Sequence, residues 1–493
     1  SKMMGGKENR LIFMLLGLVV LYFLCNQILQ FLLSGTADLD QAEQLLVSQD
    51  FKLGYSAQPP LYTWVVKALF SITGPSLFLL LLLKSVVLSM LAVSIVCIGR
   101  LFSFTVQQQI IAVISIVFLP QIIWESQRDL THSPLATAMA AVTLLQVVAL
   151  QRAQTIFNYV SVGCLVGLGL LSKYNYFVFL MSLVFSVLFT PQYRSVLLNK
   201  RIIFALIPAI LIIFPHYYWV VNHLDAVSGS VHKLQAGGGG FFSGIGQAIL
   251  SALAFLSPLW LFSFVLLGCK DTGSKVSGFD KKLLINLLVL ELIFVAIFVL
   301  LTGAQEIKDR WFQPMLFFIP LVIAVFYKPT KRGFTIFCSL GVLFAILVSA
   351  ALSARIVLFD EIKRTSRPNI PYQNINESLS SLLGSPSVIF AETTLIGGNA
   401  RNYFKNSRVI TPDHTDDLLN EKSKAKNMAI ILCESLECND DGFSDLMKRQ
   451  FNVDTKSLSF QKIEAPYHFS HTKVHTLYWS EVKTVLSLHS AVD

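Results

Sequence analysis

The sequence contains few charged residues for its length. Asp, Glu, Lys and Arg make up only 14% of its 493 residues, whereas hydrophobic residues make up 54%. A soluble domain typically carries about 25% charged residues. The composition therefore excludes an ordinary water-soluble enzyme and favours a chain that lies largely in lipid.

Common motifs of metal and nucleotide sites are also missing. The chain contains no CxxC pair and no HExxH segment, so it carries no strong metal signature. The four glycines of "QAGGGGFF" lack the Gly-Lys-Ser/Thr ending of a P-loop. We expect no nucleic-acid partner.

Long uncharged runs are the main feature that is present. No residue between Leu11 and Ala37 is charged, and about 20 apolar residues suffice for a membrane-spanning helix. This first run is too long, and lacks the small-residue cleavage site, for a removed signal peptide. Further apolar runs lie at 76–99, 101–124, 133–150, 153–172, 174–193, 202–222, 234–269, 283–302, 311–327 and 333–354. We predict an all-α polytopic transmembrane domain of about eleven helices.

The short loops predict an orientation. With the N-terminus in the cytoplasm, the inner loops carry about twice as many Lys and Arg residues as the outer loops. An odd number of crossings then places the C-terminal tail outside. Most of the loop carboxylates also fall on the outer side, which indicates that the polar chemistry gathers there.

The tail differs in character from the rest of the chain. Short apolar runs such as "SVIFAE" and "NMAIILCE" alternate with helix-like stretches such as "DGFSDLMKRQF". This pattern predicts a small α/β domain at 355–493, after a transmembrane domain at 1–354. Cys433 and Cys438 in "CESLEC" would form a disulfide in an oxidising compartment, or remain two half-buried thiols.

Two outer loops carry clusters of carboxylates. The first, "GTADLDQAEQ", holds Asp38, Asp40 and Glu43. One interpretation is a helix capping box with Asp40 at the N-cap and Glu43 at the third helical position. That interpretation leaves Asp38 unexplained, and it does not explain a second acidic loop on the same side.

The second acidic loop, "WESQRDLTHSPL", holds Glu125, Arg128, Asp129 and His132. Alone, it would fit an ordinary solvated turn. Two such loops at one membrane face favour a site that binds a metal or deprotonates a hydroxyl.

Cations within or between the spans are candidates for phosphate binding. Lys173 in "LLSKYNYF" precedes Tyr174 and is either an interfacial lysine near an aromatic belt or a phosphate contact. Lys84 lies inside a predicted span, where ionisable groups are rare and usually paired or functional. One interpretation pairs it with Glu291, which lies in another span.

Two further outer loops contribute candidates. The segment "NHLDAVSGSVHKLQAGGGGFF" contains His223, His232 and Lys233 before four glycines, which suggests a flap at the membrane surface. In "KDRWFQPML", Arg310 is suited to bidentate recognition of phosphate.

These loops together predict a transferase that uses a lipid-linked donor. The outer compartment has no pool of nucleotide sugars, so an activated sugar would arrive on polyprenyl phosphate. The alternatives are a transporter or flippase of lipid-linked sugars and a non-catalytic scaffold with a sensory outer domain. Transporters often contain inverted repeats and midplane sites, whereas this sequence has no convincing repeat and its ionisable residues cluster outside.

The two acidic loops, the "QPPLYTW" segment and the "KDRWFQPML" element resemble those of the GT-C glycosyltransferases. Within that superfamily the chain is similar to the branch of protein O-mannosyltransferases and lipid A aminoarabinose transferases, and to bacterial proteins resembling lipopolysaccharide galacturonosyltransferases. The resemblance covers roughly residues 10 to 350.

The resemblance implies a multi-pass protein of the bacterial inner membrane, surrounded by membrane lipids, with its active site and C-terminal domain in the periplasm. It implies a polyprenyl-phosphate-linked sugar donor, a glycolipid acceptor such as lipid A or lipopolysaccharide, and a single inverting displacement. The catalytic Asp-Glu pair of the family falls on Asp40-Gln41. Because Gln41 departs from the pattern, Asp38 or Glu43 would supply the second carboxylate.

The resemblance and the residues of the outer loops together suggest the remaining roles. The second-loop acid falls near Asp129 or His132, and a divalent metal held by Asp40 and Asp129 is as compatible with the residues as metal independence. The carrier phosphate would contact Lys173, with Arg128, Arg310 and Lys84 as helpers. The predicted substrate-binding residues are Tyr55, Gln58, Glu125, His132, Tyr174, His223, His232 and Lys233.

Overall fold

The computed structural model describes residues 5–228, 240–267, 275–363, 366–414 and 428–482. The chain divides into two compact units. Unit 1 comprises Ser1–Asn26, Lys52–Tyr62 and Leu83–Ser349, and unit 2 comprises Gln27–Phe51, Thr63–Leu82 and Ala350–Asp493. The first acidic loop and the C-terminal part of the chain therefore belong to the same unit.

Apolar helices confirm a multi-pass membrane protein. Within the described part of the chain, six are long enough to cross a membrane: α1 (Gly6–Leu33), α4 (Leu77–Leu101), α7 (His132–Arg152), η2 with α11 (Lys200–Asn222), α15 (Gly278–Thr302) and α18 (Lys331–Val357). The total rises to ten among the described residues if each of four bent helix pairs is one span. Helix α8 (Ile156–Leu170) is apolar but shorter, and it covers the remaining predicted run.

The bent pairs arise where proline or a π-turn interrupts the helix. Helix α5 (Val106–Val117) is followed at 65° by the π-turn η1 (Gln121–Glu125) and α6 (Ser126–Arg128). Helix α9 (Tyr176–Phe189) turns by 110° into α10 (Pro191–Leu198). The other pairs are α13 (Phe241–Phe255) with α14 (Leu259–Phe262) and η3 (Ser263–Leu267), and η4 (Asp309–Phe312) and α16 (Gln313–Leu316) with α17 (Ile319–Phe326).

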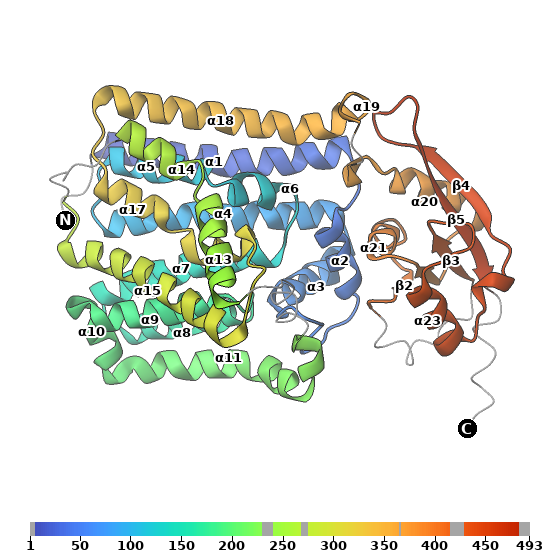
Figure 1. The fold of residues 1–493 in the computed structure, drawn as a ribbon, viewed down its shortest axis with the longest axis horizontal. Coiled ribbons are helices and arrows are strands. Elements are labelled where there is room, and N and C mark those ends of the chain that lie inside the picture. The colour runs from blue at the N-terminus through green and yellow to red at the C-terminus, as the bar shows by residue number, and fades with distance from the viewer. Residues whose placement is uncertain (1–4, 229–239, 268–274, 364–365, 415–427, 483–493) are drawn as a thin grey trace. The chain divides into compact units, whose positions relative to one another are not determined.

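Small residues bring two spans of unit 1 into close contact. A Cβ atom at Gly163 of α8 would overlap the main chain of α11 (Ile203–Asn222) at Ala205, and one at Gly167 would lie 2.9 Å from Cβ of Ile212. Glycines four residues apart allow this approach, as in other membrane helix pairs. Figure 1 shows α7, α8, α9, α11 and α15 running alongside one another, with α10 at their left-hand end.

Unit 2 contains a five-stranded sheet in the order β2-β1-β3-β5-β4. Strand β1 (Val388–Ala391) pairs in parallel with β2 (Arg408–Ile410) and β3 (Ala429–Cys433). Strand β5 (Val474–Val482) runs antiparallel to β3 and to β4 (Gln461–Pro466). The predicted strand segments "SVIFAE" and "NMAIILCE" become β1 and β3, and "DGFSDLMKRQF" becomes α23 (Asp441–Phe451).

Helices cover both faces of this sheet (Figure 1). One apolar cluster joins the sheet to α20 (Tyr372–Leu383) and α21 (Thr394–Tyr403), and it includes Leu46, two residues after the first acidic loop. The other cluster joins the opposite face to α23. The structure also places Cys433 and Cys438 in a disulfide, with their Cα atoms 5.4 Å apart.

The predicted pairing of Lys84 with Glu291 is wrong. Glu291 is buried in α15, and neither of its carboxylate oxygens has a hydrogen-bond partner among the described residues. Lys84 instead donates to main-chain carbonyls in the second acidic loop. Two ionisable groups in different spans neutralise one another only when helix packing brings the ends of the two side chains into contact. The composition of the sequence does not reveal that packing.

Candidate active site

One end of unit 1 gathers most of the polar residues that the sequence singles out. Helix α7 begins there, α8 ends there, α9 begins there and α11 ends there. The segments 53–62, 125–133 and 172–176 meet at this end. The hydrogen bonds described below connect them.

Lys173 joins the second acidic loop to the loop between α8 and α9. Its Nζ donates to Oγ of Ser133, 2.6 Å away, in the first turn of α7. Thr131 occupies the N-cap position of α7 but forms no side-chain hydrogen bond with that turn. A helix N-terminus with a lysine beside it is suited to an anion, because the amide dipoles and the ammonium attract the same charge.

Tyr174, next along the chain, belongs to a chain of hydrogen bonds. Its hydroxyl lies 3.0 Å from Nε2 of His216, and Nδ1 of His216 lies 2.9 Å from the carbonyl oxygen of Leu53. Burial raises the pKa of the Tyr174 hydroxyl above its ordinary value, so it stays a neutral donor. A Cβ atom at Gly54 would overlap the indole of Trp219, so the segment before Gln58 packs closely against α11.

The second acidic loop is built around Lys84. This lysine is 1% exposed, and its Nζ donates to the carbonyls of Ser126 (2.9 Å), Asp129 (2.5 Å) and Leu130. Leu130 has φ of 71°, a left-handed conformation that a non-glycine residue rarely adopts. These contacts favour a structural role for Lys84, whose predicted part in phosphate binding stays a prediction.

Glu125 and Arg128 on the same turn form an ion pair of 2.7 Å. A buried glutamine that the sequence reading missed, Gln313, bridges this turn to α7. Its side chain donates to the carbonyl of Gln121 (3.1 Å), and its oxygen accepts from Thr137 (3.3 Å). A glutamine within "WFQPML" does not stand out in the sequence. Only its burial reveals its role, because a buried amide must have hydrogen-bond partners.

In unit 2, helix α2 (Leu39–Val47) carries the first group of carboxylates, and its N-cap is Asp38. The interpretation with Asp40 at the N-cap is therefore wrong, because Asp40 is the second residue of the helix, within its first turn. The carboxylate of Asp38 accepts from the amide of Leu39 (2.8 Å) and forms an ion pair of 3.1 Å with Arg367. Asp38 is 2% exposed, whereas Asp40 and Glu43 are partly exposed.

Side chains of helix α21 form hydrogen bonds with α2 and with the residue before its N-cap. Arg401 of α21 donates to the carbonyl of Leu45 and to Oγ of Ser48 (2.8 Å). Asn399 accepts from the amide of Ala37 (2.8 Å) and donates to its carbonyl (3.1 Å). Burial lowers the pKa of the Arg401 guanidinium to about 10, which leaves it charged at neutral pH.

Asp50, which follows α2, is also held by an arginine of unit 2. Arg408 on β2 binds both carboxylate oxygens of Asp50. Bidentate pairs of this kind restrict orientation as well as adding energy. The sequence did not predict a role for Arg367, Arg401 and Arg408. They follow α2 by more than 300 residues and resemble the charged surface residues of any α/β domain.

The other predicted residues are more scattered. Arg310 is exposed on η4, and the exposed imidazole of His223 stacks on Trp219 at 4.4 Å. The hydroxyl of Tyr55 accepts from the amide of Lys52 (3.1 Å), and Gln58 is partly buried. His132 is partly buried and lies beside Tyr62, with ring centroids 5.9 Å apart. His232 and Lys233 lie outside the described residues.

The metal prediction stays a prediction. Among the described residues, one group of acidic or thiol ligands has its donor atoms within 4.8 Å of one another: Glu392, Cys433 and Cys438. Both sulfurs of that group are bonded to each other in the disulfide. It therefore does not fit a divalent ion as it stands.

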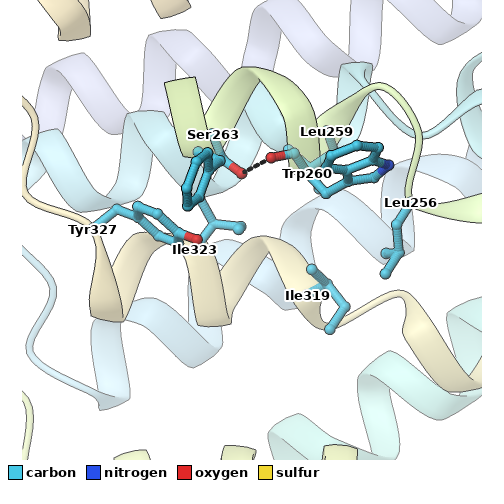
Figure 2. A pocket seen from close by; sticks show the side chains of 8 residues that line it. Leu256, Leu259, Trp260, Ser263, Ile319, Ile323 and Tyr327 are labelled. Carbon is cyan, nitrogen blue, oxygen red and sulfur yellow. Dashed lines mark hydrogen bonds between the residues drawn. The ribbon is translucent and has the colours of Figure 1, made fainter. Parts of the chain in front are cut away.

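A separate cavity of about 320 Å³ lies in unit 1 between α13, α14 and α17. Its walls are mostly apolar, as Figure 2 shows with Trp260, Ile319 and Ile323. The hydroxyl of Ser263 donates back to the carbonyl of Trp260 (3.2 Å). No acid or base lines this cavity, so it offers nothing for sugar transfer.

Comparison with known proteins gives consistent matches. The family model described as dolichyl-phosphate-mannose-protein mannosyltransferase matches residues 57–219. The lipopolysaccharide core galacturonosyltransferase RgtA of Rhizobium johnstonii is 27% identical over 432 residues, which cover 84% of this chain and 85% of RgtA. RgtB of the same organism is 26% identical over 422 residues, which cover 83% of this chain and 85% of RgtB.

The fold also matches a solved structure. The crystal structure of ArnT from Cupriavidus metallidurans bound to undecaprenyl phosphate superposes with a TM-score of 0.57. The match covers 95% of this chain and 99% of ArnT at 12% identity. It confirms the predicted architecture, a polytopic helical domain with a small sheet-containing domain near the C-terminus.

Proposed function

Because this chain is a glycosyltransferase of the GT-C type, related to lipopolysaccharide core galacturonosyltransferases, we propose that its donor is a polyprenyl-phosphate-linked sugar. We further propose that the acceptor is lipid A, lipopolysaccharide core or a related envelope glycolipid. The named activities of the relatives and the lipid bound to ArnT support both statements. The enzyme class itself is confirmed, which disfavours the transporter and scaffold alternatives.

The observation that carries the proposal is the position of Lys173. The ammonium is held at the first turn of α7 by Ser133, where the helix has no side-chain cap. A lipid phosphate that enters from the membrane would meet an ammonium and main-chain amides at the same point. Both stabilise negative charge, which increases on the carrier phosphate as it leaves.

The proposed reaction is a single displacement with inversion. The acceptor hydroxyl oxygen bonds to the anomeric carbon while the bond from that carbon to the carrier phosphate oxygen breaks. The polyprenyl phosphate leaves with the electron pair, and the acceptor proton passes to a carboxylate. We assign that carboxylate to Asp40, on which the first residue of the family's catalytic pair falls. Asp38 on the same helix is the N-cap and the partner of Arg367.

We place the reaction on the periplasmic face of the inner membrane. The Cys433–Cys438 disulfide supports an oxidising compartment for the C-terminal part of the chain. The bias of basic residues toward the other side supports the same orientation.

Binding of undecaprenyl phosphate to the purified protein tests the donor. Lys173→Ala should weaken this binding by about tenfold or more, the effect expected from losing one charge-assisted contact. Lys308→Ala is the matched control, because Lys308 is exposed and lies outside the Ser133 contact. Equal affinities of the two variants would remove Lys173 from the donor site.

The acceptor is tested in cells. Mass spectrometry of envelope glycolipids from a deletion strain should show the loss of one sugar mass from lipid A or core oligosaccharide. Restoration by the wild-type gene, but not by an Asp40→Asn gene, would link that sugar to this enzyme. An unchanged glycolipid profile would contradict the proposed acceptor class.

A further inference from the structure

A second polar site lies at the opposite end of the same spans in unit 1. A groove of about 480 Å³ opens between the α7–α8 linker and α10, lined by Gln154, Pro191, Arg194, Ser195, Leu198 and Asn199. The reaction proposed above does not use this end of the helices. The groove therefore needs an explanation of its own.

A helix bend and several hydrogen bonds fix the backbone around the groove. Helix α10 bends 110° away from α9, so it lies across the ends of the spans rather than along them. The hydroxyl of Tyr159 on α8 donates to the carbonyl of Val196 (2.8 Å) and attaches α10 to the bundle. The side chain of Gln154 donates to Ser195 (2.8 Å) and accepts from Asn199 (2.9 Å), which closes the floor of the groove.

Exposed basic residues give the groove a positive charge. Arg194, Lys200 and Arg201 are exposed along or beside it. The sequence contains no Asp or Glu between residues 130 and 224. The carboxylate of Asp280 on α15 is buried and is held by Arg152 and Tyr193.

The two arginines retain donors for a ligand. Arg194 donates from Nε to the carbonyl of Leu188 (2.8 Å), and Arg201 donates from one terminal nitrogen to the carbonyl of Gln154 (2.7 Å). These are the hydrogen bonds of their side chains within the described structure. A guanidinium has five N–H donors, so each arginine still presents several toward solvent.

Apolar side chains surround this charge. Leu198 is 71% exposed, Ile203 is 52% exposed and Phe157 on α8 is 77% exposed. In a chain that spans a membrane, such surfaces contact acyl chains. A basic groove bordered by exposed apolar residues at the end of membrane helices has the chemistry of a phospholipid, with an anionic head and apolar tails.

We propose that this groove binds the phosphate headgroup of an anionic membrane phospholipid. Arg194 and Arg201 contact the phosphate, and the Ser195 hydroxyl donates a further hydrogen bond. The acyl chains lie along Leu198 and Ile203. The site is distinct from the proposed donor site, which lies at the other ends of α7, α8, α9 and α11.

Native mass spectrometry tests the proposal. The full-length protein is taken from bilayers of equal parts phosphatidylglycerol and phosphatidylcholine, and the retained lipids are counted. The wild type should retain phosphatidylglycerol preferentially. Each arginine that contacts the phosphate directly contributes a charge-assisted hydrogen bond whose loss costs about tenfold, so the Arg194→Gln, Arg201→Gln double variant should lose roughly 100-fold.

The matched control is the Arg100→Gln, Arg332→Gln double variant, which removes two exposed arginines outside the groove. It should retain the wild-type preference. If the control loses as much phosphatidylglycerol as the groove variant, the attraction is a general effect of surface charge and the proposal is overturned. No preference in the wild type would also overturn it.

Two further measurements keep the test decisive. The Arg194→Lys, Arg201→Lys variant keeps the charge and should retain most of the preference, which covers the case in which the glutamine variant fails to fold. Inorganic phosphate at millimolar concentration should not displace the lipid. Displacement by free phosphate would show that the groove binds a water-soluble anion instead.

Discussion

The two acidic loops carry similar residues but are built in different ways. Helix α2 in unit 2 is regular, has Asp38 as its N-cap and is held by Arg401 and Asn399 of α21. The second loop in unit 1 follows a π-turn, contains a left-handed residue and surrounds one buried ammonium. The first loop is thus held mainly by contacts with α21, whereas the second is centred on Lys84, with Gln313 as a further support.

The difference shows how a carboxylate can be held in place. A regular helix satisfies its own main chain, so remote side chains need only fix its position. An irregular turn leaves carbonyls inside the protein, and each must be satisfied by another group. Lys84 does this for three carbonyls at once, so the second loop should be the more vulnerable of the two.

The largest expected effect is that of Lys84→Met. The change keeps the length of the side chain but removes three hydrogen bonds to carbonyls. We expect it to lower the free energy of unfolding by about 3 kcal/mol or more. Thermal unfolding in detergent measures the effect.

Lys67→Met is the control for Lys84→Met. Lys67 is partly exposed and donates a hydrogen bond of 3.1 Å to the carbonyl of Gln49, so its loss should change stability little. A stable Lys84→Met protein that has lost donor binding would instead support the predicted phosphate contact.

Asp40→Asn should have the next largest effect, on catalysis alone. Because Asp38 caps α2, the asparagine should leave the fold and the affinity for undecaprenyl phosphate unchanged. Turnover should fall on the order of a hundredfold, which corresponds to about 2.7 kcal/mol of barrier. Asp38→Asn keeps a capping residue and should mainly weaken the contact with Arg367. Near-normal turnover of Asp40→Asn would move the catalytic role to Asp129 or Glu43.

Arg401→Met should act through the position of α2. It removes the bonds to Leu45 and Ser48 and the contact with the Phe70 ring, 5.6 Å away. We expect about a tenfold loss of kcat with little change in KM for the donor, because α2 is displaced while the donor site is intact. Arg449→Met, which affects only a surface pair with Asp445 at 4.0 Å, is the control. An equal loss in both variants would show that α21 does not position α2.

The smallest expected effect is on pH dependence. Burial lowers the pKa values of His468 and His475 in unit 2. Their unfolded forms bind more protons between the lowered values and about 6.5, so stability should fall as the pH drops through that range. Burial raises the pKa of Glu392, so this group has the opposite effect. Its contribution to stability is lost as the pH rises through the pKa that it has in the folded protein.

Hydrogen exchange measured at pH 8 and pH 5.5, after correction for intrinsic rates, tests this effect. Amides of α21 should lose protection at the lower pH, whereas residues 126–131 of the second loop should not. The His468→Gln, His475→Gln variant should lose the difference. If amides of α21 and of residues 126–131 lose protection to the same extent, the two acidic loops are not stabilised independently.

Much of the architecture could be read from composition. The predicted apolar runs coincide with α1, α4, α7, α8, α11, α15, α18 and the bent pairs. The tail segments "SVIFAE" and "NMAIILCE" became paired strands, and "CESLEC" contains a disulfide. These features are local, because hydrophobic length and periodicity are properties of consecutive residues.

The roles of individual polar residues were less accessible. Asp40 fitted a capping box, yet Asp38 is the cap, since a shift of two residues changes no composition. His216 gave only a weak signal, a polar residue in an apolar span, although it connects Tyr174 to the main chain of Leu53. Such roles depend on partners far away in the chain.

The sequence by itself determined that the chain crosses a membrane repeatedly, that carboxylates cluster in two segments between apolar runs and that a small α/β domain follows. Each of these follows from the free energy of moving local apolar runs out of water. Only the tertiary structure decided that Lys84 is occupied by carbonyls while Lys173 lies at a helix N-terminus. Both are single lysines among apolar residues, and what distinguishes them is which polar groups the packed helices bring within hydrogen-bond distance.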